Sequence, residues 1–465
     1  MKKPHYRVIG LLTVLIATSS YAQENWVNLF NGKNLDGWER HSGEAKFYVE
    51  DGCIVGEAIE TKANTFLCPS GTYSDFELEL EYLIDAGLNS GVQFRSELFA
   101  EPRKIYVEGR RPTVPADRLH GYQCEIDMSP RMWAAGVYDE VRRNWLYPGK
   151  LGGSTTNFSE QGRSIAKPGE WNQLRIRCVG TSIRTWLNGE LRTDMNDAMT
   201  LEGRIGLQVH GVNKDGAGKR VRFRNIRLRE IAVAPNTLTP EEERAGWVLL
   251  WNGRDKTGWR SAKSKNFPKE GWRIQDQALT VVANNGEESA AGGDIITRER
   301  YANFELLLEF RMTPGANSGI KIFAQPDLSP IDKVTGRPTP VGSAIGLEFQ
   351  ILDDANHPDA KLGRDGNRTL GSVYDLIPAP ADKIVKPMGE WNRARIVSQG
   401  QHVQFWLNGQ LTAEFDRSSE AFKQLVAESK YKNIVGFGEW SEGHILLQEH
   451  GSPVSFRNLK LRKLP

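Results

Sequence analysis

The strongest constraint on the fold is an internal repeat. LFNGKNLDGW begins at Leu29 and returns as LWNGRDKTGW at Leu250, and GEWNQLRI at Gly169 returns as GEWNRARI at Gly389. The other motif pairs keep the same order: DFELELEY with NFELLLEF, LNSGVQF with ANSGIKIF, TWLNGEL with FWLNGQL, GLQVHG with LLQEHG, and RFRNIRLR with SFRNLKLR. So many matches in one order indicate a tandem duplication of one domain.

Each half consists of short runs in which apolar and polar residues alternate, the pattern of a half-buried strand. In the run 76–84 the side chains predicted to face the core are Phe76, Leu78, Leu80, Tyr82 and Ile84. Asn188-Gly189 and Asn408-Gly409 predict tight hairpins, because both positions of a type I′ turn need positive φ. Many such strands with almost no long helical pattern predict two sandwiches of antiparallel sheets.

The joint between the two copies is predicted at 233–246. This stretch contains two prolines and then a capping-box pattern, with Thr239 as N-cap, Pro240 at the first helical position and Glu242 three residues after the cap. We expect a first domain over 24–232, a linker with a short helix over 233–246, and a second domain over 247–465.

Residues 1–22 have the features of a secretory signal peptide. Lys2, Lys3 and Arg7 precede an apolar run over 8–17, and Ser20-Tyr21-Ala22 places small residues at the positions that direct cleavage. This run is short for a membrane span, and no later segment approaches the roughly 20 apolar residues that a span needs. We therefore predict a periplasmic or secreted protein without membrane insertion.

The charge of the chain argues against a nucleic-acid partner. The full chain has a formal net charge of +2, and the basic residues of the predicted signal peptide account for all of this excess. A nearly neutral mature chain lacks the clustered positive charge that nucleic-acid binding requires.

All four cysteines, Cys53, Cys68, Cys124 and Cys178, lie in the first half. An exported compartment permits disulfides, but the sequence does not select among the three pairings. Cys124 and Cys178 alternate with polar residues in strand-like runs, which fits small core residues equally well, and we favour buried free thiols.

Strand alternation also shows which polar residues share the face directed away from the core. In the first domain, GVQFRS, GYQCEIDM and RIGLQVHG place acids, amides, a guanidinium and an imidazole there. The residues are Gln93, Arg95, Gln123, Glu125, Asp127, Gln208 and His210. In the second domain the corresponding runs give Glu348, Gln350, Gln448 and His450. A solvated sheet face is the simpler explanation for any one of them, but both copies keep Gln-x-His-Gly and an outward glutamate, which favours a site.

A Tyr-Asp pair follows each acidic strand, at Tyr138 and at Tyr374, and in the first domain it continues into a segment with Arg142, Arg143 and Trp145. Aromatic rings stack on the apolar faces of pyranose rings, while guanidinium groups hold hydroxyls. We predict that these five residues bind a sugar, with an ordinary charged loop as the alternative.

The loop 353–371 is rich in oxygen ligands, with Asp353, Asp354, His357 and Asp359. Such clusters can hold a divalent cation, but the spacing is not that of an EF-hand. We favour a solvated loop, leave a divalent cation open, and find no indication of another cofactor.

Two known catalytic patterns fit poorly. Glu125-x-Asp127 begins like the E-x-D-x-x-E strand of laminarinase-type glycosidases, but Pro130 occupies the last position, and Gln350 takes the middle position in the second copy. The sequence also contains no G-x-S-x-G elbow, no H-E-x-x-H and no phosphate-binding glycine loop.

Taken together, LFNGKNLDGW, NSG, GYQCEIDM, GEWN, LNG, LQVHG and FRNIRL resemble the 3-keto-disaccharide hydrolase domain family. The resemblance spans nearly the whole mature chain, twice. It implies an all-β chain of two tandem concanavalin A-like jelly-roll β-sandwich domains, and a carbohydrate substrate oxidised at C3 of a hexose. An upstream sugar 3-dehydrogenase would supply that substrate.

A ketone at C3 acidifies the C2 proton, so a base can remove it and the resulting enolate can expel the group at C1. Water addition would complete a net hydrolysis, and without it the enzyme is a lyase. His210 or His450 is the candidate base, since imidazole titrates near neutral pH.

The remaining roles go to the charged residues on the same face. Arg95 or a bound cation would stabilise the enolate. Glu125 with Asp127, or Glu348 with Gln350, would hold sugar hydroxyls or protonate the leaving oxygen. Because Ile322 stands near the place of Arg95 in the second copy, we favour the first domain. A non-catalytic, lectin-like protein is the main alternative, because jelly rolls serve both purposes, and an ordinary glycosidase is another.

Overall fold

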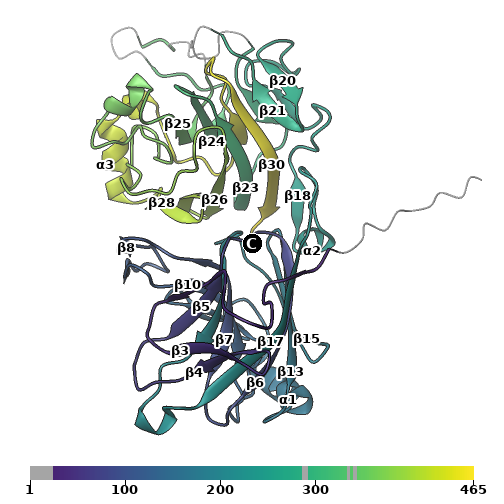
Figure 1. Cartoon of the computed structure of the whole chain (residues 1–465). Coiled ribbons are helices and arrows are strands. Elements are labelled where there is room, and N and C mark those ends of the chain that lie inside the picture. Colours follow the sequence, from purple (N-terminus) through teal and green to yellow (C-terminus); the bar gives the residue numbers. More distant parts are fainter. Residues whose placement is uncertain (1–24, 285–291, 332–335, 339–342) are drawn as a thin grey trace, which may run out of the picture.

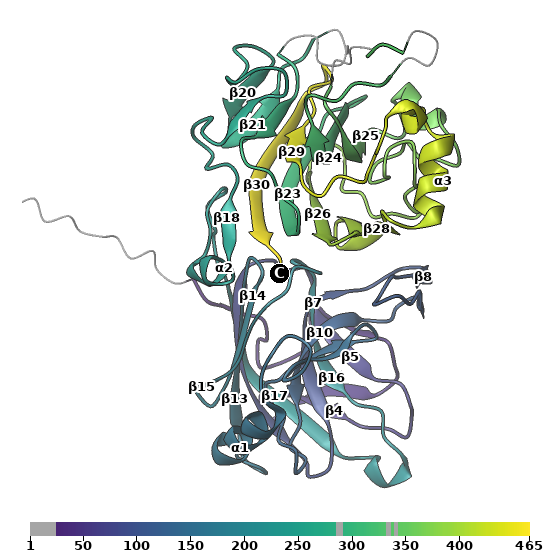
Figure 2. The same cartoon turned by 180° about the vertical axis from the view of Figure 1, so that it is seen from behind.

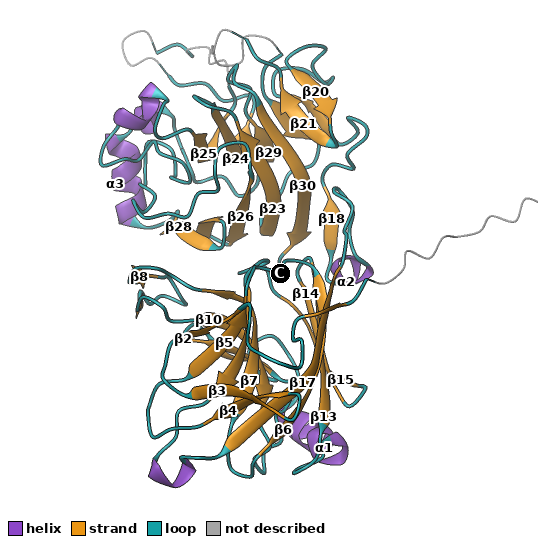
Figure 3. Ribbon diagram, viewed as in Figure 1, coloured by secondary structure: helices purple, strands orange, loops and turns teal. Residues whose placement is uncertain are grey.

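The computed structural model describes residues 25–284, 292–331, 336–338 and 343–465. The predicted signal peptide over 1–22 lies outside these residues. The chain forms two lobes stacked end to end, with the C-terminus at their boundary (Figures 1 and 2). Strands dominate both lobes (Figure 3). Within the described ranges, the search for a helix long and apolar enough to cross a membrane finds none.

The first lobe is a sandwich of two antiparallel sheets. Its outer sheet has the order β15-β14-β13-β6-β17-β4-β3, with β1 on β17. These strands are Val27–Asn28 (β1), Lys46–Glu50 (β3), Cys53–Glu57 (β4), Phe76–Ile84 (β6), Asn172–Val179 (β13), Ser182–Leu187 (β14), Glu190–Asn196 (β15) and Arg220–Glu230 (β17). The second sheet, called the site sheet below, has the order β12-β11-β10-β7-β16-β5-β2. Its strands are Trp38–His41 (β2), Thr65–Pro69 (β5), Ser90–Glu97 (β7), His120–Ile126 (β10), Val137–Glu140 (β11), Asn144–Tyr147 (β12) and Arg204–Val209 (β16).

The second lobe repeats this plan with fewer strands in its site sheet. The outer sheet has the order β20-β21-β30-β23-β26-β27-β28, with β18 on β30, and the site sheet has the order β19-β22-β29-β24-β25. The outer strands are Trp247–Leu249 (β18), Trp272–Gln275 (β20), Ala278–Val281 (β21), Phe304–Met312 (β23), Trp391–Gln399 (β26), His402–Leu407 (β27), Gln410–Asp416 (β28) and Val454–Lys463 (β30). The site-sheet strands are Trp259–Ser261 (β19), Ile295–Thr297 (β22), Asn317–Gln325 (β24), Ile345–Leu352 (β25) and His444–Leu447 (β29). The all-β fold class, with two tandem jelly-roll sandwiches, is therefore confirmed.

A few shorter elements complete the described part of the chain. The helices are Thr155–Ile165 (α1), Pro240–Arg244 (α2) and Glu420–Glu428 (α3), with 3-10 turns at Lys214–Gly216, Pro358–Lys361 and Lys430–Asn433. A small hairpin, Arg103–Lys104 (β8) with Thr113–Val114 (β9), projects from the first domain near the boundary (Figure 1).

The predicted alternation is observed in β6. Phe76, Leu78, Leu80, Tyr82 and Ile84 are all buried. Both predicted hairpin turns also have positive φ, 50° and 88° at Asn188-Gly189 and 49° and 84° at Asn408-Gly409. Period-2 patterning and turn chemistry were therefore sufficient to predict these hairpins.

The four cysteines are buried free thiols, as we favoured. Burial raises the pKa of the Cys68 and Cys178 thiols to about 12. Since only the thiolate is nucleophilic, these side chains are inert core residues.

The linker helix α2 has the predicted capping box. The Thr239 side chain accepts from the Glu242 backbone N–H, and the Glu242 carboxylate accepts from the Thr239 backbone N–H. Glu242 also pairs with Lys460 near the end of β30, so the cap ties the linker to the second domain.

The two domains share apolar and polar contacts. Trp406 and Leu411 of the second domain belong to the core cluster of the first. Arg103 of β8 lies 3.5 Å from Asp382. The lobes therefore pack directly on each other.

Candidate functional site

A hollow of about 350 Å³ lies on the site sheet of the first domain. Its lining contains six of the residues predicted from strand alternation and aromatic content: Gln123, Glu125, Tyr138, Trp145, Gln208 and His210. The other lining residues are Lys62, Asn64, Asn89, Arg131 and Glu140. The hollow thus combines acids, amides, cations, an imidazole and two aromatic rings.

Glu125 is one of two acids that line this hollow, with Glu140, and the residue is only 5% exposed. Desolvation by burial raises its pKa to about 7, against the opposing effect of two amide donors. Asn89 Nδ2 donates to its Oε1 at 2.9 Å, and Gln123 Nε2 donates to its Oε2 at 3.1 Å. A carboxyl with this pKa exchanges its proton near neutral pH, as a general acid or base must.

The orientation of Gln123 is fixed by two further amides. Gln208 Nε2 and Gln93 Nε2 donate to Gln123 Oε1 at 2.9 and 3.2 Å. Its oxygen is therefore occupied, and its NH₂ group must face Glu125. Gln93, predicted to touch a sugar, instead lies fully buried behind Gln123.

His210 follows the end of β16 and forms another part of the lining. Its Nδ1 lies 2.6 Å from the Gly211 carbonyl oxygen. Because a carbonyl only accepts, Nδ1 carries a proton, and the neutral ring keeps its lone pair on Nε2. The local backbone thus prepares Nε2 as a base.

Asp127 does not reach the hollow as a free acid. Its carboxylate accepts from Arg131 Nε at 2.7 Å, and Arg131 lies over the rings of Trp133 and Trp145, 4.4 and 4.8 Å from their centroids. Arg131, which we did not predict, is therefore one of two cations that line the hollow, with Lys62. The position of Arg131 four residues after Asp127 was the sequence feature that could have indicated this ion pair.

The predicted outward orientation of Arg95 is wrong. The residue is fully buried and has a φ of 46°. Its guanidinium donates to the carbonyls of Ser74 and Gly180 at 2.8 and 2.7 Å and lies 3.1 Å from Asp75. A register shift between β7 and β10 at this point inserts an extra residue and interrupts the alternation.

Arg142 and Arg143 also lie away from the hollow, contrary to the prediction that they bind sugar. Both donate to Asp139, at 2.7 and 2.6 Å, and both guanidinium groups lie against the Tyr122 ring. Arg143 also pairs with Asp197 at 2.7 Å. The turn between β11 and β12 directs these two side chains into the domain, where they are structural.

We expected Glu125 of the first domain to correspond to Glu348 of the second. The strand pairing in the two site sheets shows that this correspondence is wrong. Gly91 pairs with Glu125, whereas Gly319, in the same Asn-Ser-Gly motif, pairs with Gln350. A side chain added at Gly91 would collide with Gln123, and one at Gly319 with Glu348. Glu125 therefore corresponds to Gln350, so the two domains exchange the places of acid and amide.

The same strand pairing also changes which residue of the second domain corresponds to Arg95. Ile322 pairs with Leu347 as Phe94 pairs with Tyr122. The counterpart of Arg95 is therefore Phe323, which also has a positive φ, of 52°.

The second domain presents different chemistry on its site sheet. Lys321 lies where the first domain has Gln93, and its Nζ is 3.6 Å from Glu348. Gln448 keeps the place of Gln208, since its carbonyl accepts from Ser318 as that of Gln208 does from Ser90, at 2.8 and 2.7 Å.

Two further predicted residues of this domain lie beside the loop 353–371. The His450 ring lies 6.4 Å from that of His357, centroid to centroid. Tyr374 donates to Asp359 at 2.8 Å. Desolvation and the neighbouring His450 lower the pKa of His357, which favours its neutral form.

The acids of this loop hold the local structure through hydrogen bonds to backbone and side chains, Asp359 through Arg368 and Tyr374. Asp353 accepts from the Gly315, Ala355 and Asn356 backbone N–H groups, at 2.7, 3.2 and 3.3 Å. Within the parts of the chain that the structure describes, three or more His, Cys, Asp or Glu side chains do not gather as a metal site.

Comparison with known proteins assigns both halves of the chain to one family. Residues 25–229 and 246–462 match the model of the 3-keto-alpha-glucoside-1,2-lyase-like domain. The 3-keto-disaccharide hydrolase of Bacteroides thetaiotaomicron is 34% identical over 232 residues, covering 47% of this chain and 79% of that relative.

Two solved structures are also similar. A protein of Parabacteroides distasonis, provisionally described as a glycosyl hydrolase, is 27% identical and covers 50% of this chain and 100% of its own, with a TM-score of 0.42. The carbohydrate-binding module CBM66 from Bacillus subtilis is 18% identical and covers 42% and 96%, with a TM-score of 0.24. On the two matched segments, the chain belongs to the family of 3-keto-alpha-glucoside-1,2-lyase-like domains, present twice in tandem.

Proposed function

We propose that this protein is an exported enzyme that cleaves the glycosidic bond of 3-keto-glycosides or 3-keto-disaccharides in its first domain. Family membership makes it a hydrolase or lyase of carbohydrate. The observation that supports the site best is the shared hollow of Glu125, with a pKa of about 7, and His210, whose Nε2 is free to accept a proton.

The proposed reaction begins with removal of the C2 proton by His210 Nε2. The C–H electron pair forms an enolate whose negative charge rests on the C3 oxygen. As the C3 carbonyl re-forms, a double bond forms between C1 and C2 and the C1–O bond breaks. The leaving oxygen takes the proton of Glu125. Water addition to the enone would give the free 3-keto sugar, and release of the enone would make the enzyme a lyase.

The other residues that line the hollow support these reaction steps. Arg131 supplies a fixed positive charge for the enolate oxygen, since its ion pair and the two tryptophan rings hold it in place. Tyr138 and Trp145 offer aromatic surface for the sugar ring. A divalent cation is an alternative source of the positive charge, and a chelator control separates the two.

The substrate must come from an oxidation at C3, so we propose a sugar 3-dehydrogenase upstream. The signal-like residues 1–22 support release into the periplasm or the medium. The duplication leaves the second domain free for a binding or structural role.

Replacing His210 by alanine is expected to lower the rate of aglycone release from a 3-keto-glucoside by about 10²–10⁴-fold, the usual contribution of a general base. The matched variant His450→Ala, in the second domain, should keep the rate within about threefold. Initial rates at saturating substrate measure both. A large loss of rate in His450→Ala with little change in His210→Ala would indicate that the reaction takes place in the second domain.

The pH profile should show an alkaline limb set by Glu125. Its proton is needed for the leaving group, and its pKa is about 7 because of burial. We expect kcat/KM to fall about tenfold per pH unit above this value. A substrate with a leaving group that needs no protonation, such as 4-nitrophenol, should lose this limb. An unchanged limb with that substrate would contradict the assignment of Glu125 as the acid.

A further inference from the structure

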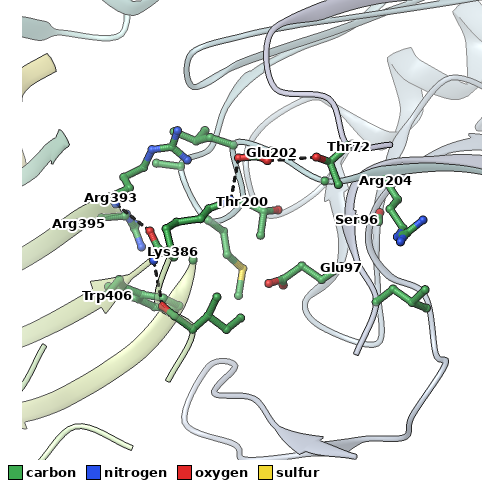
Figure 4. Close-up of a pocket in the computed structure, with 18 of the residues that line it drawn as sticks. Thr72, Ser96, Glu97, Thr200, Glu202, Arg204, Lys386, Arg393, Arg395 and Trp406 are labelled. Atoms are coloured by element: carbon green, nitrogen blue, oxygen red, sulfur yellow. Dashed lines mark hydrogen bonds and ion pairs between the residues drawn. The ribbon is translucent and has the colours of Figure 1, made fainter. Parts of the chain in front are cut away.

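The two domains enclose a second hollow, of about 390 Å³, which the proposed reaction does not use (Figure 4). We call it the interdomain cleft. Its walls are Thr72, 96–99 and 198–204 of the first domain and Ile384, Lys386, Arg393, Arg395, Trp406, Asn408 and Gly409 of the second. The volume lies within the range of roughly 300–1,000 Å³ found for small-molecule sites.

Each arginine on the second-domain wall pairs with a glutamate that also pairs with a second arginine, Arg462 for Glu305 and Arg457 for Glu309. Arg395 Nε lies 2.6 Å from Glu305, and Arg393 lies 3.5 Å from Glu309. Guanidinium groups keep further N–H donors after such pairing, because each carries five. This wall therefore offers hydrogen-bond donors whose positive charge is only partly compensated.

Acceptors and donors face each other across the cleft. Glu202 of the first domain lies 3.5 Å from Lys386 of the second, and Thr72 donates to the other oxygen of Glu202 at 3.2 Å (Figure 4). Both members of the Lys386–Glu202 pair are more than one-third exposed, at 37% and 39%. The pair is long and solvated, so it can exchange its contact for ligand hydroxyls at small cost.

Apolar atoms also belong to the lining. Trp406 is buried to 7% exposure, with Arg395 over its ring at 5.2 Å, and Met199 contributes a thioether from the first domain. A small apolar surface between charged donors and acceptors matches the two-sided nature of a pyranose, which has apolar ring faces and a rim of hydroxyls.

We propose that the interdomain cleft is a second carbohydrate site, which binds a neutral saccharide of one to three pyranose rings. The carboxylates of Glu97 and Glu202 on the first-domain wall disfavour an anionic ligand, and the charged lining disfavours an apolar one. Because both domains supply walls, an occupied cleft links the domains and stabilises the whole chain by mass action. This site is separate from the hollow around Glu125 and does not depend on the function proposed for it.

The test is isothermal titration of the full chain with three unoxidised probes, D-glucose, maltotriose and cellotriose. We expect at least one to bind at a site whose affinity falls at least tenfold in Lys386→Met and in Glu202→Gln. The same site should stay within twofold of the original affinity in Glu125→Gln. Lys423→Met, which removes an exposed ion pair on α3, is the matched control and should have no effect.

Two results would overturn the proposal. One is the absence of binding of all three probes at concentrations up to tens of millimolar. The other is binding that Glu125→Gln weakens and the two cleft variants leave unchanged, which would place every saccharide in the hollow of the first domain. Because the substituted cleft side chains are partly exposed, both variants are expected to fold.

Discussion

Replacing Glu125 by glutamine is expected to lower kcat/KM for a 3-keto-glucoside by about 10²–10⁴-fold, since the variant keeps the shape of the side chain and loses its proton. The fall of kcat/KM above pH 7 should also be absent from this variant. Steady-state kinetics between pH 5 and 9 measure both effects. A variant with full activity would exclude Glu125 as the acid.

The same substitution should not weaken the fold. The folded-state pKa of Glu125, about 7, lies above the ordinary value of 4.5. The stability that its protonated form contributes is therefore present below pH 4.5 and is lost as the pH rises through 7. Glutamine avoids this loss and is expected to raise the free energy of unfolding above pH 7 by up to roughly 3 kcal/mol. Gln350→Glu, at the equivalent position of the second domain, is the matched kinetic control.

Asp139→Ala is expected to cost about 3–5 kcal/mol in the free energy of unfolding. Asp139 is fully buried and accepts from both Arg142 and Arg143, so its removal leaves the buried Arg142 without its closest acceptor and Arg143 with Asp197 alone. Urea unfolding followed by fluorescence measures the loss.

An exposed ion pair provides the comparison. Asp382→Ala removes the partner of Arg103, and because the Asp382 side chain is 53% exposed, the expected change is within about 1 kcal/mol. Under conditions where Asp139→Ala remains folded, its KM for the keto sugar should be unchanged. A raised KM with little loss of stability would instead indicate that Arg142 and Arg143 bind substrate.

The fold was predictable because its determinants are local and repeated. Alternation in β6, the Asn-Gly turns and the capping box at Thr239 each act over a few residues, and each recurs or is confirmed by its partner. The duplication then repeated the strand and turn signals in the second domain.

The site was predictable only as far as the alternation extends. Glu125, His210 and the amides of the hollow lie on regular strands or directly after them. Arg95 follows Phe94 at a left-handed bulge, and nothing in the local sequence marks that break. The β-branched and aromatic residues around it fit a continuous strand equally well.

The other errors have a related cause. Arg142 and Arg143 are in a turn, where side-chain direction depends on tertiary partners such as Asp139 and Asp197. The exchange of acid and amide between the domains was missed because a shift of two residues preserves the face and changes only the register.

The most direct test of the proposed reaction is product analysis by mass spectrometry, in D₂O, of the protein incubated with a 3-keto-glucoside and with its unoxidised parent. Proton abstraction at C2 predicts aglycone release from the keto sugar alone, with deuterium at C2 of any free 3-keto sugar that water addition forms. Equal rates with and without chelator are expected if Arg131, and not a divalent cation, stabilises the enolate. Release from the parent sugar at a similar rate, or a free 3-keto sugar without deuterium at C2, would contradict elimination at the Glu125 and His210 site.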